Sequence, residues 1–150
     1  MFELESKNPD EITIKTATKT ITINSAESTI SAGLGVGDIK GPGEFEIGEA
    51  TIRGIGIMNN TNTIYDVKIG NIHVCITAGF EEGLDDLGIA DILCTTSVRS
   101  VMEISPKLVV AMGNVDGMVT ELKLTARTEK KLKVKKLEDL PAAMEVVVLN

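Results

Sequence analysis

The side chains that most often hold a catalytic metal or activate a nucleophile are scarce in this sequence. His73 is the single histidine among 150 residues, and Cys75 and Cys94 are the only cysteines. A catalytic zinc needs about three protein ligands, mostly imidazole, and a nucleophile needs an adjacent base. One imidazole and two thiols in separate apolar runs cannot supply either arrangement. We therefore expect two free, buried thiols, and a structural or surface role for His73.

Two further patterns could bind a cation or a phosphate. Glu44, Glu46 and Glu49 alternate with apolar residues, and Asp66 follows in a later segment. Their oxygens suit Mg²⁺ or Ca²⁺, but carboxylates that alternate along a strand more often form its solvated face, and no spaced calcium loop follows. The glycine-rich run 33–37 lacks the Lys and Ser/Thr of a phosphate loop and opens no helix. We interpret it as a kinked strand or a tight connection.

The composition limits the number of domains and the classes of partner. A chain of 150 residues that is 43% hydrophobic fits one globular domain with its own core. The formal net charge of −7 argues against a nucleic-acid or anionic-membrane surface, because both need a basic footprint. No apolar run reaches transmembrane length, and the N-terminus, Met1-Phe2-Glu3-Leu4-Glu5, lacks the features of a signal peptide. We expect a cytoplasmic protein.

Hydrophobic periodicity predicts strands at both ends of the chain and alternating strands and helices between them. We interpret the first ten residues as a polar segment and expect a hairpin over 11–24, with isoleucines on its buried face. Gly41-Pro42-Gly43-Glu44 has the chemistry of a type II turn in which Gly43 takes a positive φ. The other expected elements are strands through Ile47 and over 50–57, 61–69 and 72–78, a short helix over 81–87, a strand over 91–95, a helix after Ser97, a strand over 107–112, a helix with apolar positions from Val115 to Ala126, and strands over 131–135 and 144–149.

Several of these segments resemble small zinc-dependent hydrolases of the metallo-β-lactamase fold. G-P-G-E-F-E-I-G leading to T-I-R-G-I, at residues 41–55, is similar to the segment that follows the first metal motif in one branch of that family. Residues 63–67, 70–75, 82–93 and 133–149 resemble later segments of the family's sequences. The similarity lies in scaffold residues. It implies an α+β fold, a shortened αββα sandwich in which two sheets lie face to face with helices outside.

The metal-binding residues of that family are missing from the matching positions. In the family, the His-x-His-x-Asp-His loop lies between the first hairpin and the turn that corresponds to Gly41-Pro42-Gly43-Glu44, which we call the proline corner. Residues 24–40 of this sequence contain no histidine. Ile76 and Gly79 stand where the family has a His and a nearby Asp, Gly113 stands where it has another His, and Asn114 follows. The resemblance therefore implies a frame without catalytic residues, metal ligands or cofactor. These four residues are the candidate ligand-binding residues of a vacated pocket.

Three functions are compatible with such a frame. The first is a non-catalytic, metal-free relative of the hydrolases that acts as a binding or assembly module. The others are a metal-dependent hydrolase with an atypical site and a binder of an unidentified small molecule in the vacated pocket. We also expect a homodimer that pairs through the edge of the hairpin 12–23, because lysines discourage pairing along 131–135. No nucleic-acid or membrane partner is expected.

Overall fold

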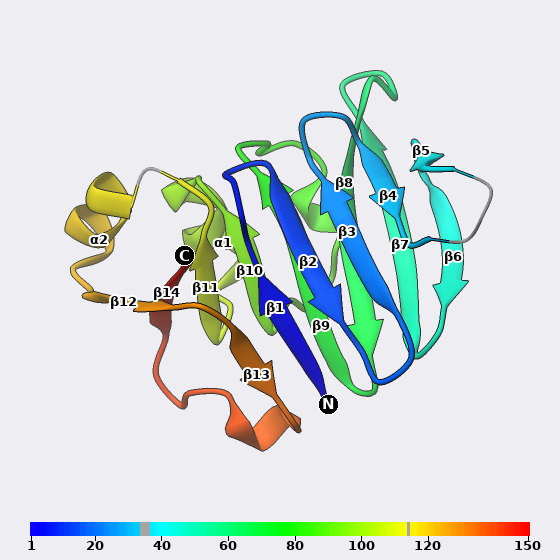
Figure 1. Cartoon of the computed structure of the whole chain (residues 1–150). Helices are drawn as coiled ribbons and strands as arrows, with labels where there is room; N and C mark the ends of the chain where they lie inside the picture. The colour runs from blue at the N-terminus through cyan, green and yellow to red at the C-terminus, as the bar shows by residue number, and fades with distance from the viewer. Residues whose placement is uncertain (34–36, 114) are drawn as a thin grey trace.

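The computed structural model describes residues 1–33, 37–113 and 115–150, and its strands form two sheets that lie face to face (Figure 1). The first sheet has six strands in the order β13 (Leu132–Val134), β1 (Phe2–Glu5), β2 (Glu11–Lys15), β3 (Thr20–Asn24), β4 (Thr29–Ser31) and β5 (Ile39–Lys40). The second has eight, in the order β12 (Ala126–Glu129), β14 (Glu145–Leu149), β11 (Leu108–Ala111), β10 (Ile92–Thr95), β9 (Ile72–Ala78), β8 (Asn62–Ile69), β7 (Ala50–Ile57) and β6 (Gly43–Ile47).

Strand direction divides the eight-stranded sheet into two halves. The strands β6 to β9 pair antiparallel in sequence order, whereas β9, β10, β11, β14 and β12 all pair in parallel. Two α-helices connect the parallel strands, α1 (Val98–Ile104) and α2 (Val115–Leu122), and two short 3₁₀ helices cover 84–86 and 137–139. None of the described helices is long and apolar enough to cross a membrane.

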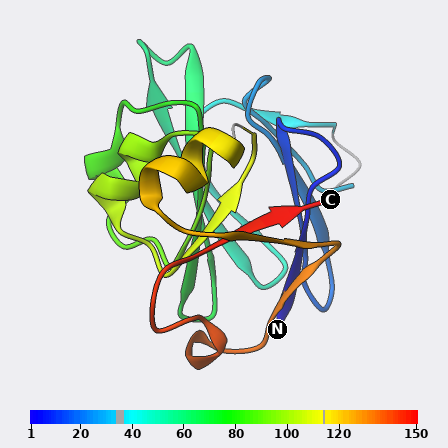
Figure 2. The ribbon, with the colours of Figure 1, turned by 90° about the vertical axis from the view of Figure 1, so that its left-hand side faces the viewer.

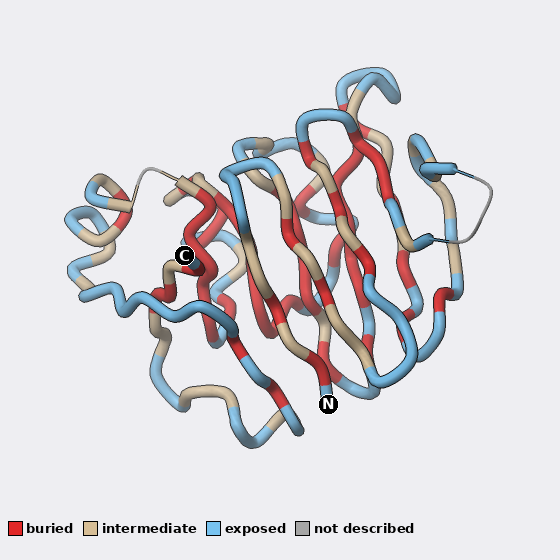
Figure 3. Tube along the Cα trace, viewed as in Figure 1, coloured by how far each residue is buried: buried red, intermediate tan, exposed pale blue. Residues whose placement is uncertain are grey.

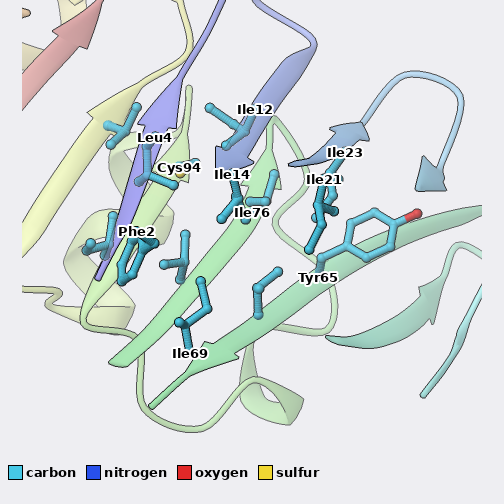
Figure 4. Close-up of a cluster of buried hydrophobic side chains, with 14 of the residues drawn as sticks. Phe2, Leu4, Ile12, Ile14, Ile21, Ile23, Tyr65, Ile69, Ile76 and Cys94 are labelled. Carbon is cyan, nitrogen blue, oxygen red and sulfur yellow. The ribbon is translucent and has the colours of Figure 1, made fainter. Parts of the chain in front are cut away.

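The larger core lies between the two sheets and follows from the alternation of apolar residues along the strands. Ile12 and Ile14 of β2 lie opposite Ile23 and Ile21 of β3, as the sequence predicts, and all four are fully buried. Figure 3 shows the resulting alternation of buried and half-buried residues along both strands, and Figure 4 shows the inward side chains against Tyr65 and its neighbours from the facing sheet. This packing fixes which face of each strand is available to a site.

A second apolar cluster covers the outer face of the eight-stranded sheet. Val101 of α1 and Met118 of α2 pack with Cys75, Leu93 and Val109. Figure 2 shows both helices on this side of the molecule. Over the outer face of the six-stranded sheet, no helix lies in the described part of the chain, so a second outer helical layer is not confirmed.

The polar outer face of the six-stranded sheet needs no such cover. There, the hydroxyls of Thr13 and Thr22 lie 3.1 Å apart across the hairpin, and the Lys15 ammonium contacts Glu5 at 3.2 Å. These side chains satisfy one another in contact with water. The face therefore exposes little apolar surface.

The proline corner is not the type II turn expected from its residues. Gly43 has the expected positive φ, but its value of 149° is far from the roughly 80° of a type II turn, and Gly43 already pairs with Gly54 in β6. Gly41 also has a positive φ, of 86°. The physical reason is topological: β5 ends at Lys40 in one sheet and β6 begins at Gly43 in the other. The corner therefore carries the chain between sheets instead of reversing it within one.

Four strands, β1, β4, β5 and β12, were not expected, and one expected edge is internal. Phe2 and Leu4 of β1 are buried, and β1 pairs with both β13 and β2. β12 includes Ala126, which the sequence placed on a helix; the helix ends at Leu122 because Lys123 takes a φ of 57°. β2 pairs with β1 and β3 pairs with β4, so the hairpin has no free edge for the interface expected there.

Candidate functional site

The strand ends nearest the expected pocket lie together because β9, β10 and β11 are parallel neighbours. Gly79 follows β9, Thr96 follows β10 and Gly113 closely follows β11. A Cβ atom on Gly79 would lie 3.2 Å from the Thr96 hydroxyl, and one on Gly113 would lie 3.6 Å from the Thr96 methyl group. Thr96 therefore lies between the two glycines. Sites of open parallel sheets form at this end of the strands, and we call this region the strand-end site.

The backbone of β9 bends where it enters this region. The pairing of β9 with β10 shifts register between Cys94 and Thr95, and Ala78 has a φ of 48°, which is uncommon for a residue with a Cβ atom. The Ala78 carbonyl accepts hydrogen bonds from the Thr95 hydroxyl at 2.7 Å and from the Thr96 N–H at 2.9 Å. These bonds hold the bulged end of β9 in place and present Gly79 to the surface.

Two hollows border the glycines. The one beside Gly79 has a volume of about 320 Å³ and is lined by Asp10, Ser25, Ala26, Ala78, Gly79 and Phe80. The one beside Gly113 has a volume of about 240 Å³ and is bounded mainly by the N-terminal loop 6–9, the end of β11 and the last residues of β14. Gly79 and Gly113 thus line two separate hollows.

Ser25 is the polar group of the Gly79 hollow that lacks a protein partner. The residue is 4% exposed, and its hydroxyl makes no hydrogen bond within the described residues. Its N–H donates to the Asp10 carbonyl at 2.8 Å, which fixes the position of Asp10 beside it. A buried hydroxyl without a partner costs free energy, and in a native protein it often marks the place of a water molecule or a ligand.

The four candidate residues inferred from the family resemblance do not lie together in the structure. Gly79 and Gly113 lie on either side of Thr96, whereas Ile76 is 1% exposed and packs in the core between the sheets. Asn114 lies outside the described residues. The sequence reasoning did not identify Asp10, Ser25 or Thr96; for Thr96 there was a signal, because polar residues directly follow the buried strand β10.

The histidine and Asp66 meet elsewhere, on the outer face of the eight-stranded sheet. The Asp66 carboxylate, whose side chain is 9% exposed, lies 2.9 Å from the Nδ1 atom of His73 and 3.8 Å from the Arg53 guanidinium. Arg53 also donates to the Asp86 and Leu87 carbonyls. We call Arg53, Asp66, His73 and Cys75 the Asp66 cluster.

Every contact of the Asp66 cluster holds one element against another. The His73 N–H donates to the Asp91 carboxylate at 2.8 Å, and the His73 carbonyl accepts from the Asp91 N–H at 3.0 Å. Burial, with a smaller contribution from the Asp66 charge, raises the pKa of the Cys75 thiol, and burial alone raises that of Cys94. Both cysteines are free and protonated at neutral pH, so neither is an activated nucleophile.

The side chains at the strand ends do not fit a catalytic zinc. In the part of the chain that the structure describes, no group of three or more His, Cys, Asp or Glu side chains could hold a metal ion. The Gly79 hollow offers one hydroxyl and one carboxylate, without imidazole or thiolate. Zinc sites are built mainly from imidazole nitrogen and thiolate sulfur, with carboxylate oxygen as an occasional ligand.

The fold is shared with known structures, although no protein-family profile matches the sequence and no curated protein sequence matches it significantly. A crystal structure from Thermotoga maritima, assigned to the metallo-β-lactamase superfamily as a Zn-dependent hydrolase, superposes with a TM-score of 0.71 at 16% identity. The match covers 99% of each chain. The metallo-β-lactamase fold protein YhfI from Bacillus subtilis has a TM-score of 0.44 at 12% identity, over 70% of this chain and 48% of that one. The chain has the metallo-β-lactamase fold in a shortened form.

Proposed function

We propose that this protein is a non-catalytic binding module that keeps the frame of the metallo-β-lactamase fold without its metal chemistry. Its binding region is the strand-end site, and its ligand is a small molecule held in the Gly79 hollow. The observation that carries this proposal is made at Ser25, a residue that lines a hollow of about 320 Å³ and whose hydroxyl is buried and unpartnered among the described residues.

The chemistry of the lining indicates the kind of ligand. Ala26, Ala78 and Phe80 offer apolar surface, while Ser25 and Asp10 offer oxygen atoms that accept hydrogen bonds. An ammonium group on a short apolar body matches both features, because its N–H groups donate to the hydroxyl and to the carboxylate. The net charge of −7 favours a cation over an anion.

A series of four-carbon probes tests the site. Butylamine, butanol and butyrate are titrated separately into isotope-labelled protein, and amide chemical shifts are recorded by NMR. We expect butylamine to perturb the amides of Ser25, Ala26 and Gly79 more strongly than butanol does, and butyrate to leave them unchanged. The absence of any perturbation at these amides with all three probes would overturn the proposal.

A variant that fills the hollow provides the control. Gly79→Leu adds a bulky side chain at a residue that lines the hollow, and we expect it to abolish the butylamine response. Gly79→Ala adds only a Cβ atom, 3.2 Å from the Thr96 hydroxyl, and retains most of the response. Equal responses in the two variants would show that the probe binds elsewhere.

Metal content tests the non-catalytic part of the proposal. The protein, purified without a histidine tag, is analysed by inductively coupled plasma mass spectrometry before and after incubation with zinc and a desalting step. We expect far less than one zinc per chain, because the strand ends supply no imidazole. About one tightly held zinc per chain would overturn this proposal and support a metal-dependent hydrolase with an atypical site.

A further inference from the structure

The two described sheets end in four strands whose outer edges are free of further pairing: β13 and β5 in one sheet, and β12 and β6 in the other. Unpaired N–H and C=O groups on such an edge can pair with another chain. Because two identical edges related by a two-fold axis pair antiparallel, the charge pattern of a strand decides whether it can pair with itself.

Three of the four edges are unsuited to pairing with a second copy. β6 carries the exposed carboxylates of Glu44 and Glu46 on one face, and lysines 131 and 133 place like charges along β13. Antiparallel self-pairing of either strand brings like charges opposite each other. β5 has only two residues, Ile39 and Lys40, and is too short to align a partner.

The fourth edge, β12, combines opposite charges. Its residues Ala126, Arg127, Thr128 and Glu129 are all exposed. Arg127 and Glu129 lie on the same face of the strand, and each side chain is close to half exposed. Arg127 already contacts Glu145 on the neighbouring strand and Glu129 at 3.5 Å. The strand thus presents one positive and one negative side chain, two residues apart.

The backbone of β12 presents its free groups at the residue between these charges. The Asn150 N–H donates to the Glu129 carbonyl at 2.9 Å, so the backbone of Glu129 faces β14. Backbone groups alternate in direction along a strand, so Arg127 also faces β14, whereas Ala126 and Thr128 direct their N–H and C=O groups outward. Thr128 is therefore the natural centre of a symmetric pair.

We propose that two copies of this chain pair β12 with β12, antiparallel, around a two-fold axis at Thr128. The two Thr128 residues exchange N–H···O=C bonds, and Arg127 of each protomer lies opposite the partner's Glu129. Those residues then occupy the non-hydrogen-bonded positions, where opposing side chains are closest. The two eight-stranded sheets become continuous. The pairing is short, which predicts a weak, concentration-dependent dimer.

Light scattering and analytical ultracentrifugation of the full chain, from about 10 to 500 µM, test the proposal. We expect the mass to rise toward twice 16.0 kDa with concentration. Thr128→Pro removes an N–H that faces outward, so the fold survives, as circular dichroism checks, and the protein becomes monomeric. A monomer of unaltered protein across this range, or a dimer that Thr128→Pro leaves intact, would overturn the proposal.

Charge exchange gives a second test with a matched control. Glu129→Arg places two arginines opposite each other at both contacts and weakens the dimer, whereas the double variant Arg127→Glu with Glu129→Arg restores opposite charges and restores dimerisation. Glu46→Arg, the same reversal on the other edge of the sheet, leaves the dimer unchanged. A dimer that responds to Glu46→Arg and not to Glu129→Arg would place the interface at β6 and refute the assignment.

Discussion

A functional site usually combines reactive side chains with open space for a ligand. In this protein the Asp66 cluster has the reactive side chains, and the strand-end site has the open space. The Asp66 cluster contains the imidazole, a thiol, a buried carboxylate and an arginine, but every one of these groups is engaged by a neighbour. The strand-end site contains two glycines and hydroxyl groups beside open volume, and one of the hydroxyls has no partner in the described residues.

The type of a residue and its availability to bind a ligand are therefore separate properties. A carboxylate and an imidazole at 2.9 Å have the geometry of a catalytic pair, but here they join β8 to β9. The Gly79 hollow has weaker chemistry, yet its unpaired hydroxyl can gain a hydrogen bond from a ligand without first losing one.

The largest effect is expected for His73→Ala, within the Asp66 cluster. This substitution leaves the Asp66 carboxylate buried, with Arg53 as its remaining basic neighbour at 3.8 Å. We expect the free energy of unfolding in urea to fall by about 1.5–3 kcal/mol, the range for a hydrogen bond to a charged group. The butylamine response at Gly79 should stay unchanged, because the cluster and the hollow share no lining residue.

His73→Asn is the matched variant, because its amide can place a donor near the position of Nδ1. It should recover part of the lost stability. If His73→Ala unfolds at the same urea concentration as the unaltered protein, the contact with Asp66 contributes nothing and the cluster is not structural in the sense argued above.

A smaller effect is expected for Tyr65→Phe at neutral pH. The Tyr65 hydroxyl is buried and makes no well-formed hydrogen bond among the described residues, so its removal should change stability by less than about 1 kcal/mol, in the stabilising direction. Burial raises the pKa of Tyr65 to about 12. Tyr65 therefore stays protonated in the folded protein where an unfolded tyrosine has ionised.

The sign of the pH dependence follows from that shift. Between an unfolded pKa of about 10 and the folded value of about 12, the folded state binds one proton more, so stability falls as pH rises. Tyr65 is the single tyrosine and the chain has no tryptophan, so near-ultraviolet absorbance reports its titration directly. Over this interval Tyr65→Phe should lose less stability than the unaltered protein; equal losses would contradict the shift.

Elements with a strong apolar period were predictable from the sequence. The isoleucine alternation of the hairpin gave its register, and the run 107–112, apolar on both faces, indicated the buried parallel strand β11. Ser97 caps α1 by accepting a hydrogen bond from the Ser100 N–H at 3.1 Å, as its position before an apolar run indicated. In these cases the local signal and the tertiary packing agree.

Elements defined by their neighbours were not predictable in the same way. Phe2 and Leu4 are too few to produce a period, and β12 buries no residue at all, so only pairing with β14 defines it. The change of sheet at Gly41 altered the turn for the same reason. The glycines of the site followed from the family resemblance, whereas the role of Ser25 depends on packing between distant segments, which leaves no trace in the local sequence.

The smallest effect on stability, and the sharpest contrast, is expected for Ser25→Ala. The substitution removes a buried hydroxyl that has no partner in the described residues, so the melting temperature should stay within error or rise slightly. The butylamine response at Ala26 and Gly79 should nevertheless fall severalfold, because the ligand loses its buried acceptor.

Ser100→Ala is the matched control: its hydroxyl is also buried and unpartnered among the described residues, but it lies on α1, outside the hollow. Ser100→Ala should preserve both stability and the response. If both variants bind butylamine like the unaltered protein, the Ser25 hydroxyl is only a tolerated defect, and the two regions would then be alike in lacking a group free to bind.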